Sequence, residues 1–85
     1  MVIGVTMVKV VPGQERTVYH TLKRREGIKD VYHVFGEYDF FVITQAEEMN
    51  KLNQLMENIR DIYDVTTARN ILIGNDNGFD ALNAY

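Results

Sequence analysis

The residues best suited to chemistry lie in a short polar stretch, Gly36-Glu37-Tyr38-Asp39, between two apolar runs. The runs are rich in β-branched and aromatic residues, and a glycine beside carboxylates between such runs is typical of a β-hairpin turn. Gly36 can adopt the positive φ that a short turn requires. We therefore predict a tight hairpin over residues 31–44. Its turn would hold carboxylates between two buried strands, which suits recognition of a small molecule.

A second candidate is Arg69, which lies in an otherwise apolar stretch near the end of the chain. A buried guanidinium without a partner is costly in free energy. We therefore expect Arg69 either to lie at the edge of a sheet with its charge in water, or to pair with a carboxylate. A structural pair is the simpler interpretation of the second case, and contact with a ligand is the alternative.

Length and charge limit the class of protein. The 85 residues suffice for one domain, and the absence of cysteine excludes disulfides and thiolate metal ligands. A net charge of −3 and a pI near 5.2 argue against direct contact with nucleic acid. The sequence has neither a signal-peptide pattern nor an apolar run long enough to span a membrane, so we expect a cytoplasmic protein without a membrane partner.

Hydrophobic periodicity predicts six elements. The first apolar stretch is closed by Pro12-Gly13, and the period then changes to that of a helix ended by Gly27. Thr44 and Glu47 fit a capping box, which predicts that the second helix starts at this point. The predicted strands span residues 2–11, 28–35, 38–44 and 65–73, and the predicted helices span residues 14–26 and 45–60. The second helix carries an apolar stripe of Met49, Leu52, Leu55, Met56 and Ile59.

The order β-α-β-β-α-β predicts an α+β fold of the ferredoxin-like class. Right-handed crossovers place both helices on one face of a four-stranded antiparallel sheet. The domain should occupy residues 1–74, followed by a tail at 75–85. Asn75-Asp76-Asn77-Gly78 in that tail does not fit a calcium-binding loop, because the acidic first position falls on Ile73. The apolar tail residues could instead dock on a neighbouring surface; they are Phe79, Leu82 and Tyr85.

The face of the sheet without helices should also be apolar. In the first strand Ile3, Val5 and Met7 alternate with Val2, Val8 and Val10, so either set leaves an apolar counterpart. The third strand repeats the pattern. Monomers seldom expose such a surface, and we therefore expect two copies to dimerise through this face.

With the elements in this order, the chain resembles the C-terminal ligand-binding and assembly domain of the Lrp/AsnC transcription regulators. The resemblance spans about residues 2–73. It is carried by Pro12-Gly13-Gln14-Glu15-Arg16 at the start of a helix, by Gly27-Ile28, and by Val34-Phe35-Gly36-Glu37-Tyr38-Asp39-Phe40, which is similar to the family's Gly-x-aromatic-Asp hairpin. Thr66-Thr67 in the last strand completes it. Full family members carry an N-terminal helix-turn-helix, and because none precedes the assembly domain in this sequence we expect a stand-alone version of the domain.

The resemblance implies a dimer that assembles further, often into an octameric ring, with an amino acid or related small effector bound between dimers. It implies effector contacts from Gly36, Tyr38, Asp39 and Thr67. Asp39 could accept from an ammonium group or could instead hold the hairpin in register. A full-length Lrp/AsnC regulator is a further possible partner. Two residues, Arg69 and Asn70, stand where the family commonly has threonine and an apolar or aromatic residue; we include both in the predicted site.

Two other classes of function compete with this interpretation. Small dimeric α+β-barrel enzymes include monooxygenases and isomerases, and His20 and His33 are possible acid–base groups. Neither histidine has a nearby nucleophile in a triad pattern, so we predict no catalytic residue, metal or cofactor. Direct DNA binding would need a basic reading helix, which the sequence lacks.

Overall fold

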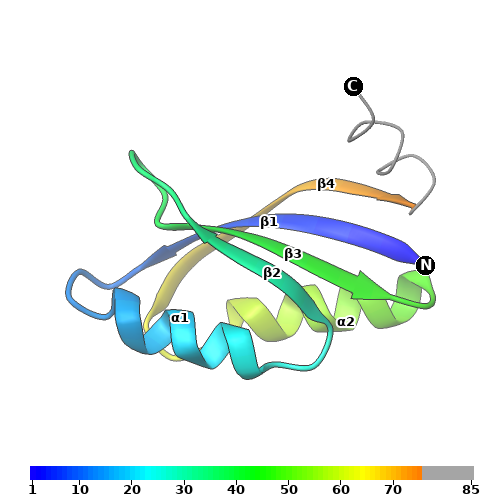
Figure 1. Cartoon of the computed structure of the whole chain (residues 1–85), viewed down its shortest axis with the longest axis horizontal. Coiled ribbons are helices and arrows are strands. Elements are labelled where there is room, and N and C mark those ends of the chain that lie inside the picture. Colours follow the sequence, from blue (N-terminus) through cyan, green and yellow to red (C-terminus); the bar gives the residue numbers. More distant parts are fainter. Residues whose placement is uncertain (76–85) are drawn as a thin grey trace.

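The computed structural model describes residues 1–75 and shows a four-stranded antiparallel sheet with two helices packed on one face (Figure 1). No helix within these residues is long and apolar enough to cross a membrane. The predicted α+β fold and its element order are confirmed. The elements are β1 (Val2–Val10), α1 (Glu15–Arg24), β2 (Ile28–His33), β3 (Phe40–Ala46), α2 (Met49–Arg60) and β4 (Val65–Asn75).

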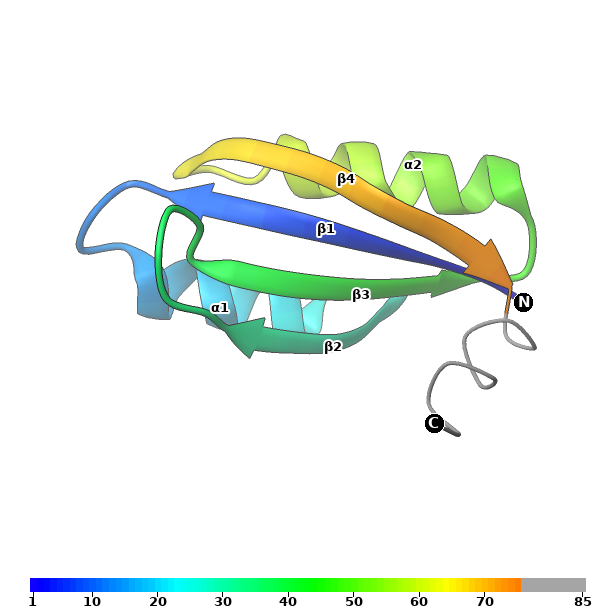
Figure 2. The same cartoon turned by 90° about the horizontal axis from the view of Figure 1, so that it is seen from above.

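Strand β1 is central in the sheet, whose order is β2-β3-β1-β4 (Figure 2). It pairs with β3 on one side and with β4 on the other, both antiparallel. Most of its residues are buried, on both faces of the sheet, which explains why its sequence is apolar at nearly every position. Strands β2 and β4 are the edges of the sheet.

The main core lies between the helices and the sheet. The apolar stripe predicted for α2 is largely confirmed, because Leu52, Met56 and Ile59 are at most 2% exposed while Met49 remains 41% exposed. Each such buried side chain contributes about 1.5–3 kcal/mol through the hydrophobic effect. α2 lies close to β1 at Gly4, where an added Cβ would lie 2.6 Å from the Met56 sulfur. The larger core cluster contains Val8, Val10, Val18, Leu22, Val31, Phe40, Val42, Ile59, Ile62 and Ala68.

The opposite face of the sheet carries the other apolar set, as the alternation predicts. Because Gly4 faces α2, its neighbours Ile3 and Val5 point away from the helices. These two side chains and that of Ile43 are nevertheless only 2%, 1% and 8% exposed in the single chain. The exposed apolar area on this face is therefore smaller than the sequence alternation implied.

The predicted capping box at Thr44 is wrong. β3 continues to Ala46, and α2 starts at Met49 after an N-cap at Glu48 that makes no side-chain capping bond. The reason is tertiary: β1 offers partners for these residues, pairing Gly4 with Thr44 and extending the ladder beyond it to Ala46. Thr44 is fully buried, and within the described residues its Oγ1 has no hydrogen-bond partner.

The hairpin and the end of α1 also differ from prediction. The β2–β3 connection is a loop over residues 34–39, longer than a tight turn, closed by a 2.9 Å bond from Val34 N to the Asp39 carbonyl oxygen. Gly36 has the predicted positive φ, at +110°. α1 ends at Arg24 with Arg25 as its C-cap, so Gly27, with φ +84°, stands beyond the cap.

The last strand is longer than predicted. β4 runs from Val65 to Asn75, two residues beyond the predicted end. The rest of the tail lies outside the described residues, and with it the predicted docking of Phe79, Leu82 and Tyr85 and most of the stretch compared with a calcium-binding loop.

Candidate functional site

Asp39 joins the hairpin to the central strand. Its backbone N–H donates to the Val8 carbonyl oxygen at 2.8 Å, and its Oδ2 accepts from the Val10 N–H at 2.8 Å. A carboxylate that accepts from a backbone N–H makes a strong, charge-assisted bond. Of the two roles left open by the sequence, holding the hairpin in register is the one for which the single chain provides the contacts. Within residues 1–75, Oδ1 of Asp39 has no hydrogen-bond partner.

The other hairpin residues surround Asp39 on the loop. Gly36 is exposed at the tip, where a Cβ would meet no atom within 4 Å, and Tyr38 is partly buried. The neighbouring Phe35 side chain is 99% exposed. The loop therefore presents backbone and aromatic surface to its surroundings.

Thr67 reaches the same end of the sheet from β4. It pairs with Lys9 of β1, and the adjacent Thr66 hydroxyl donates to the Lys9 carbonyl oxygen at 3.1 Å. Because Asp39 bonds to the residues on both sides of Lys9, the hairpin and Thr67 flank the same point of β1. The structure thus brings together two segments that the sequence analysis assigned to one site.

Arg69 and Asn70 lie on opposite faces of β4. Arg69 pairs with Met7, is exposed at the edge of the sheet, and makes no ion pair within residues 1–75, which matches the edge alternative. Asn70 pairs with Thr6, whose hydroxyl donates to Asn70 Oδ1 at 2.9 Å on the side of the helices. Thr67 and Arg69 therefore share a face from which Asn70 is excluded. The alternation of side chains along a strand was a signal for this in the sequence.

The registers define a row across all four strands that sequence reasoning missed. Tyr32 pairs with Phe41, Phe41 with Met7, and Met7 with Arg69, on the face away from the helices. The Tyr32 and Phe41 rings lie 6.2 Å apart. The carboxylate of Asp30, beside the Tyr32 hydroxyl and hydrogen-bonded to it, raises the pKa of Tyr32 above its usual value. This row places two aromatic rings and the Arg69 side chain on the same face of the sheet as Thr67.

The two histidines share a shallow hollow between α1 and β2. His33 packs against the Phe40 ring at 5.2 Å, and His20 packs against Tyr19 at 5.6 Å. The nearby Glu15 carboxylate already accepts from the Gly13 N–H. Within residues 1–75 no acid is hydrogen-bonded to either histidine, and no group of three metal-ligating side chains occurs.

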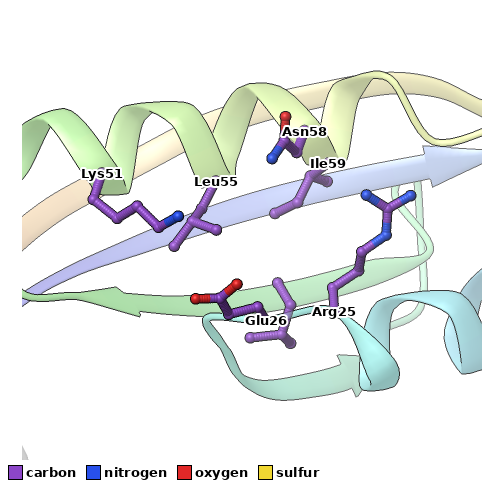
Figure 3. A pocket seen from close by; sticks show the side chains of 7 residues that line it. Arg25, Glu26, Lys51, Leu55, Asn58 and Ile59 are labelled. Carbon is purple, nitrogen blue, oxygen red and sulfur yellow. The ribbon is translucent and has the colours of Figure 1, made fainter.

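A pocket of about 210 Å³ lies between the end of α1 and the side of α2 (Figure 3). The turn after α1 forms one wall and α2 the other. No local sequence pattern predicts this pocket, because its walls come from segments separated by more than 20 residues. It is lined by the polar residues Arg25, Glu26, Lys51 and Asn58 and by the apolar residues Ile28, Leu55 and Ile59.

Comparison with known families now identifies the class of protein. Residues 2–73 match the Lrp/AsnC ligand binding domain, and the chain belongs to this family. The resemblance predicted from the hairpin motif is confirmed.

Solved structures agree with this assignment. FFRP-DM1 is 28% identical with a TM-score of 0.81, over 88% of this chain and 100% of that one. A hypothetical protein from Pyrococcus horikoshii is 28% identical with a TM-score of 0.79, over 88% of this chain and 90% of that one.

Curated relatives are enzymes that match over a small part of their length. The homocitrate synthase of Sulfurisphaera tokodaii is 36% identical over an alignment of 64 residues, and the match covers 69% of this chain and 14% of the enzyme. The homocitrate synthase of Saccharolobus solfataricus is 47% identical over 34 residues, which are 40% of this chain and 7% of the enzyme. The chain therefore corresponds to about a seventh or less of these relatives.

Proposed function

We propose that this chain is a non-enzymatic module that binds an amino acid as effector and forms symmetric assemblies, with Gly36, Tyr38, Asp39, Thr67 and Arg69 at the effector site. The membership of residues 2–73 in the Lrp/AsnC ligand binding family carries this proposal. The positions of Asp39 and Thr67 also support the proposal, because the hairpin and β4 both contact β1 at or next to Lys9.

The effector site requires a second copy of the chain. The hollow beside Thr67 is shallow, about 260 Å³, and is lined by residues of α2 and β4 without the hairpin. Exposed groups such as Phe35 and Arg69 would be covered when copies associate. We therefore place the amino acid between dimers of a ring such as an octamer. Its carboxylate would pair with Arg69 and its ammonium group with Asp39 Oδ1.

The partner that responds to the effector is either a full-length Lrp/AsnC regulator or an enzyme. The 36% identity to part of a homocitrate synthase favours adding the enzyme as a second candidate, since the same kind of module stands within that longer chain. Regulation of an enzyme would use the same effector site. Mixing the purified chain with each partner and measuring mass by light scattering, with and without amino acid, distinguishes the two.

A thermal-shift panel of the common amino acids, followed by light scattering on any hit, tests the effector site. At about a hundred times its dissociation constant, a ligand that binds only the folded state adds about 2.7 kcal/mol to the free energy of unfolding. We expect one selective hit that changes the assembly mass and is lost in Arg69→Gln. Lys23→Gln removes an exposed cation on α1 and should keep it. A melt that no amino acid shifts would contradict effector binding.

A further inference from the structure

The turn after α1 is fixed at both ends. Arg25 N donates to the Leu22 carbonyl oxygen at 3.0 Å, and Ile28 N donates to the Arg25 carbonyl oxygen at 3.3 Å. At the other side, Gln45 N of β3 donates to the Gly27 carbonyl oxygen at 2.8 Å. The backbone that carries Arg25 and Glu26 is thus tied to both a helix and the sheet. Their side chains start from defined positions at the rim of the pocket.

Gly27 allows this turn to pack against α2. Its φ of +84° favours glycine, and an added Cβ would overlap with the Leu55 side chain. Leu55 and Ile59 are 8% and 1% exposed, and they form an apolar floor between the two walls. The pocket is therefore a consequence of close backbone packing, with its floor fixed by the core.

The charged groups around this floor are unpaired within residues 1–75. Arg25, Glu26 and Lys51 are exposed, and none of them makes an ion pair there. In Figure 3, Lys51 and Arg25 stand at opposite ends of the pocket with Leu55 between them, and the Glu26 carboxylate points toward the Lys51 end. Along α2, the rise from Lys51 to Asn58 is roughly 10 Å. Two cations thus flank an apolar floor, with one carboxylate on the facing wall.

We propose that this pocket is a second small-molecule site, distinct from the effector site at the hairpin, and that it binds an amino dicarboxylate of the size of glutamate. Its two carboxylates would pair with Arg25 and Lys51, its ammonium group with Glu26, and its carbon chain would lie on Leu55. Arg25 suits a bidentate pair with a carboxylate. The charges of the ligand then complement those of the pocket one for one.

The volume of the pocket limits the ligand. A cavity of about 150 Å³ holds benzene, so about 210 Å³ suits a molecule somewhat larger than that. Drug-sized and cofactor ligands occupy about 300–1,000 Å³.

Titration of the full-length isotope-labelled chain with L-glutamate, L-glutamine and glutarate, followed by two-dimensional amide NMR, tests the proposal. L-glutamine lacks one carboxylate and glutarate lacks the ammonium group. We expect L-glutamate to shift the amide signals of Glu26, Leu55 and Asn58. L-glutamine and glutarate should each bind at least about ten-fold more weakly than L-glutamate. Equal affinity for all three compounds, or no shift of these signals, would overturn the proposal.

Matched variants sharpen the test. Arg25→Gln should weaken L-glutamate binding by about ten-fold or more, whereas Arg24→Gln, an exposed neighbour outside the pocket, should leave it within about two-fold. Because the α-carboxylate adjoins the ammonium group at the Lys51 end, Lys51→Gln should weaken the binding of both L-glutamate and L-glutamine, whereas Arg25→Gln should weaken that of L-glutamate and leave that of L-glutamine unchanged. Equal losses in Arg25→Gln and Arg24→Gln would overturn the assignment. The signals of residues 36–39 and 67–69 report on the hairpin site in the same spectra, so either site can fail while the other stands.

Discussion

The hairpin end of the sheet and the pocket beside α2 both carry charged side chains, but these charges differ in what they contact. At the hairpin, the Asp39 carboxylate is bonded to the backbone of β1. In the pocket, Arg25, Glu26 and Lys51 have no ion-pair partner within residues 1–75. Asp39, the residue that stands out in the hairpin motif, thus stabilises the fold of the single chain, whether or not it also binds a ligand. The pocket, by contrast, is formed by residues of the turn after α1 and of α2 that belong to no motif.

The largest expected effect is a loss of stability, and it should differ between alanine variants of two glycines, one from each region. Gly27→Ala should lower the free energy of unfolding by about 2–4 kcal/mol, because it combines a strained positive φ with overlap against Leu55. Gly36→Ala has the strain, with φ +110°, but open space around the new Cβ, so it should cost only about 1–2 kcal/mol. Urea unfolding of both variants measures the difference. Equal losses would mean that the turn after α1 can move away from α2.

A smaller effect concerns the carboxylates of the hairpin. Asp39→Ala should cost about 1.5–3 kcal/mol, because the Val10 N–H loses a charged acceptor. Glu37→Ala alters an exposed neighbour and should change stability by less than about 0.5 kcal/mol. Urea unfolding again provides the measurement. If Asp39→Ala were as stable as Glu37→Ala, the bond to β1 would not hold the hairpin in place.

The smallest expected effect is a change in the pKa of Tyr32, which lies on the sheet face beside the hairpin. Asp30→Asn should lower the pKa of Tyr32 toward its usual value of about 10, since the charge and hydrogen bond of Asp30 raise it. A raised pKa in the folded state means that the stability contributed by this pair is present below about pH 10 and is lost as the pH rises through the folded value.

Tyrosinate absorbance against pH measures this shift. Because the chain has five tyrosines, Tyr32→Phe is the control that identifies the transition of this residue. An unchanged titration in Asp30→Asn would exclude Asp30 as the cause.

The sequence predicted the fold and the family because both depend on local patterns. The apolar stripe of Leu52, Met56 and Ile59 follows the helical period, and the two-sided apolar pattern of β1 follows from its central place in the sheet. The positive φ of Gly36 could be predicted from its place between two strand-like runs. The alternation that puts Asn70 and Arg69 on opposite faces was also available in the sequence.

Element boundaries and the use of individual side chains required the tertiary structure. Thr44 fits a helix cap locally, but pairing with Gly4 places it in β3. The bond between Asp39 and Val10 joins residues 29 positions apart, which no local pattern encodes.

The order of the elements, their buried faces and the family can thus be predicted from the sequence, because hydrophobic periodicity and turn chemistry act over a few neighbouring residues. Which charges bond to the backbone and which border a cavity depends on contacts between distant segments, and these are seen only in the folded chain. The pocket beside α2 exists because the absence of a Cβ at Gly27 lets one turn lie against Leu55, a contact between segments that the chain order keeps apart.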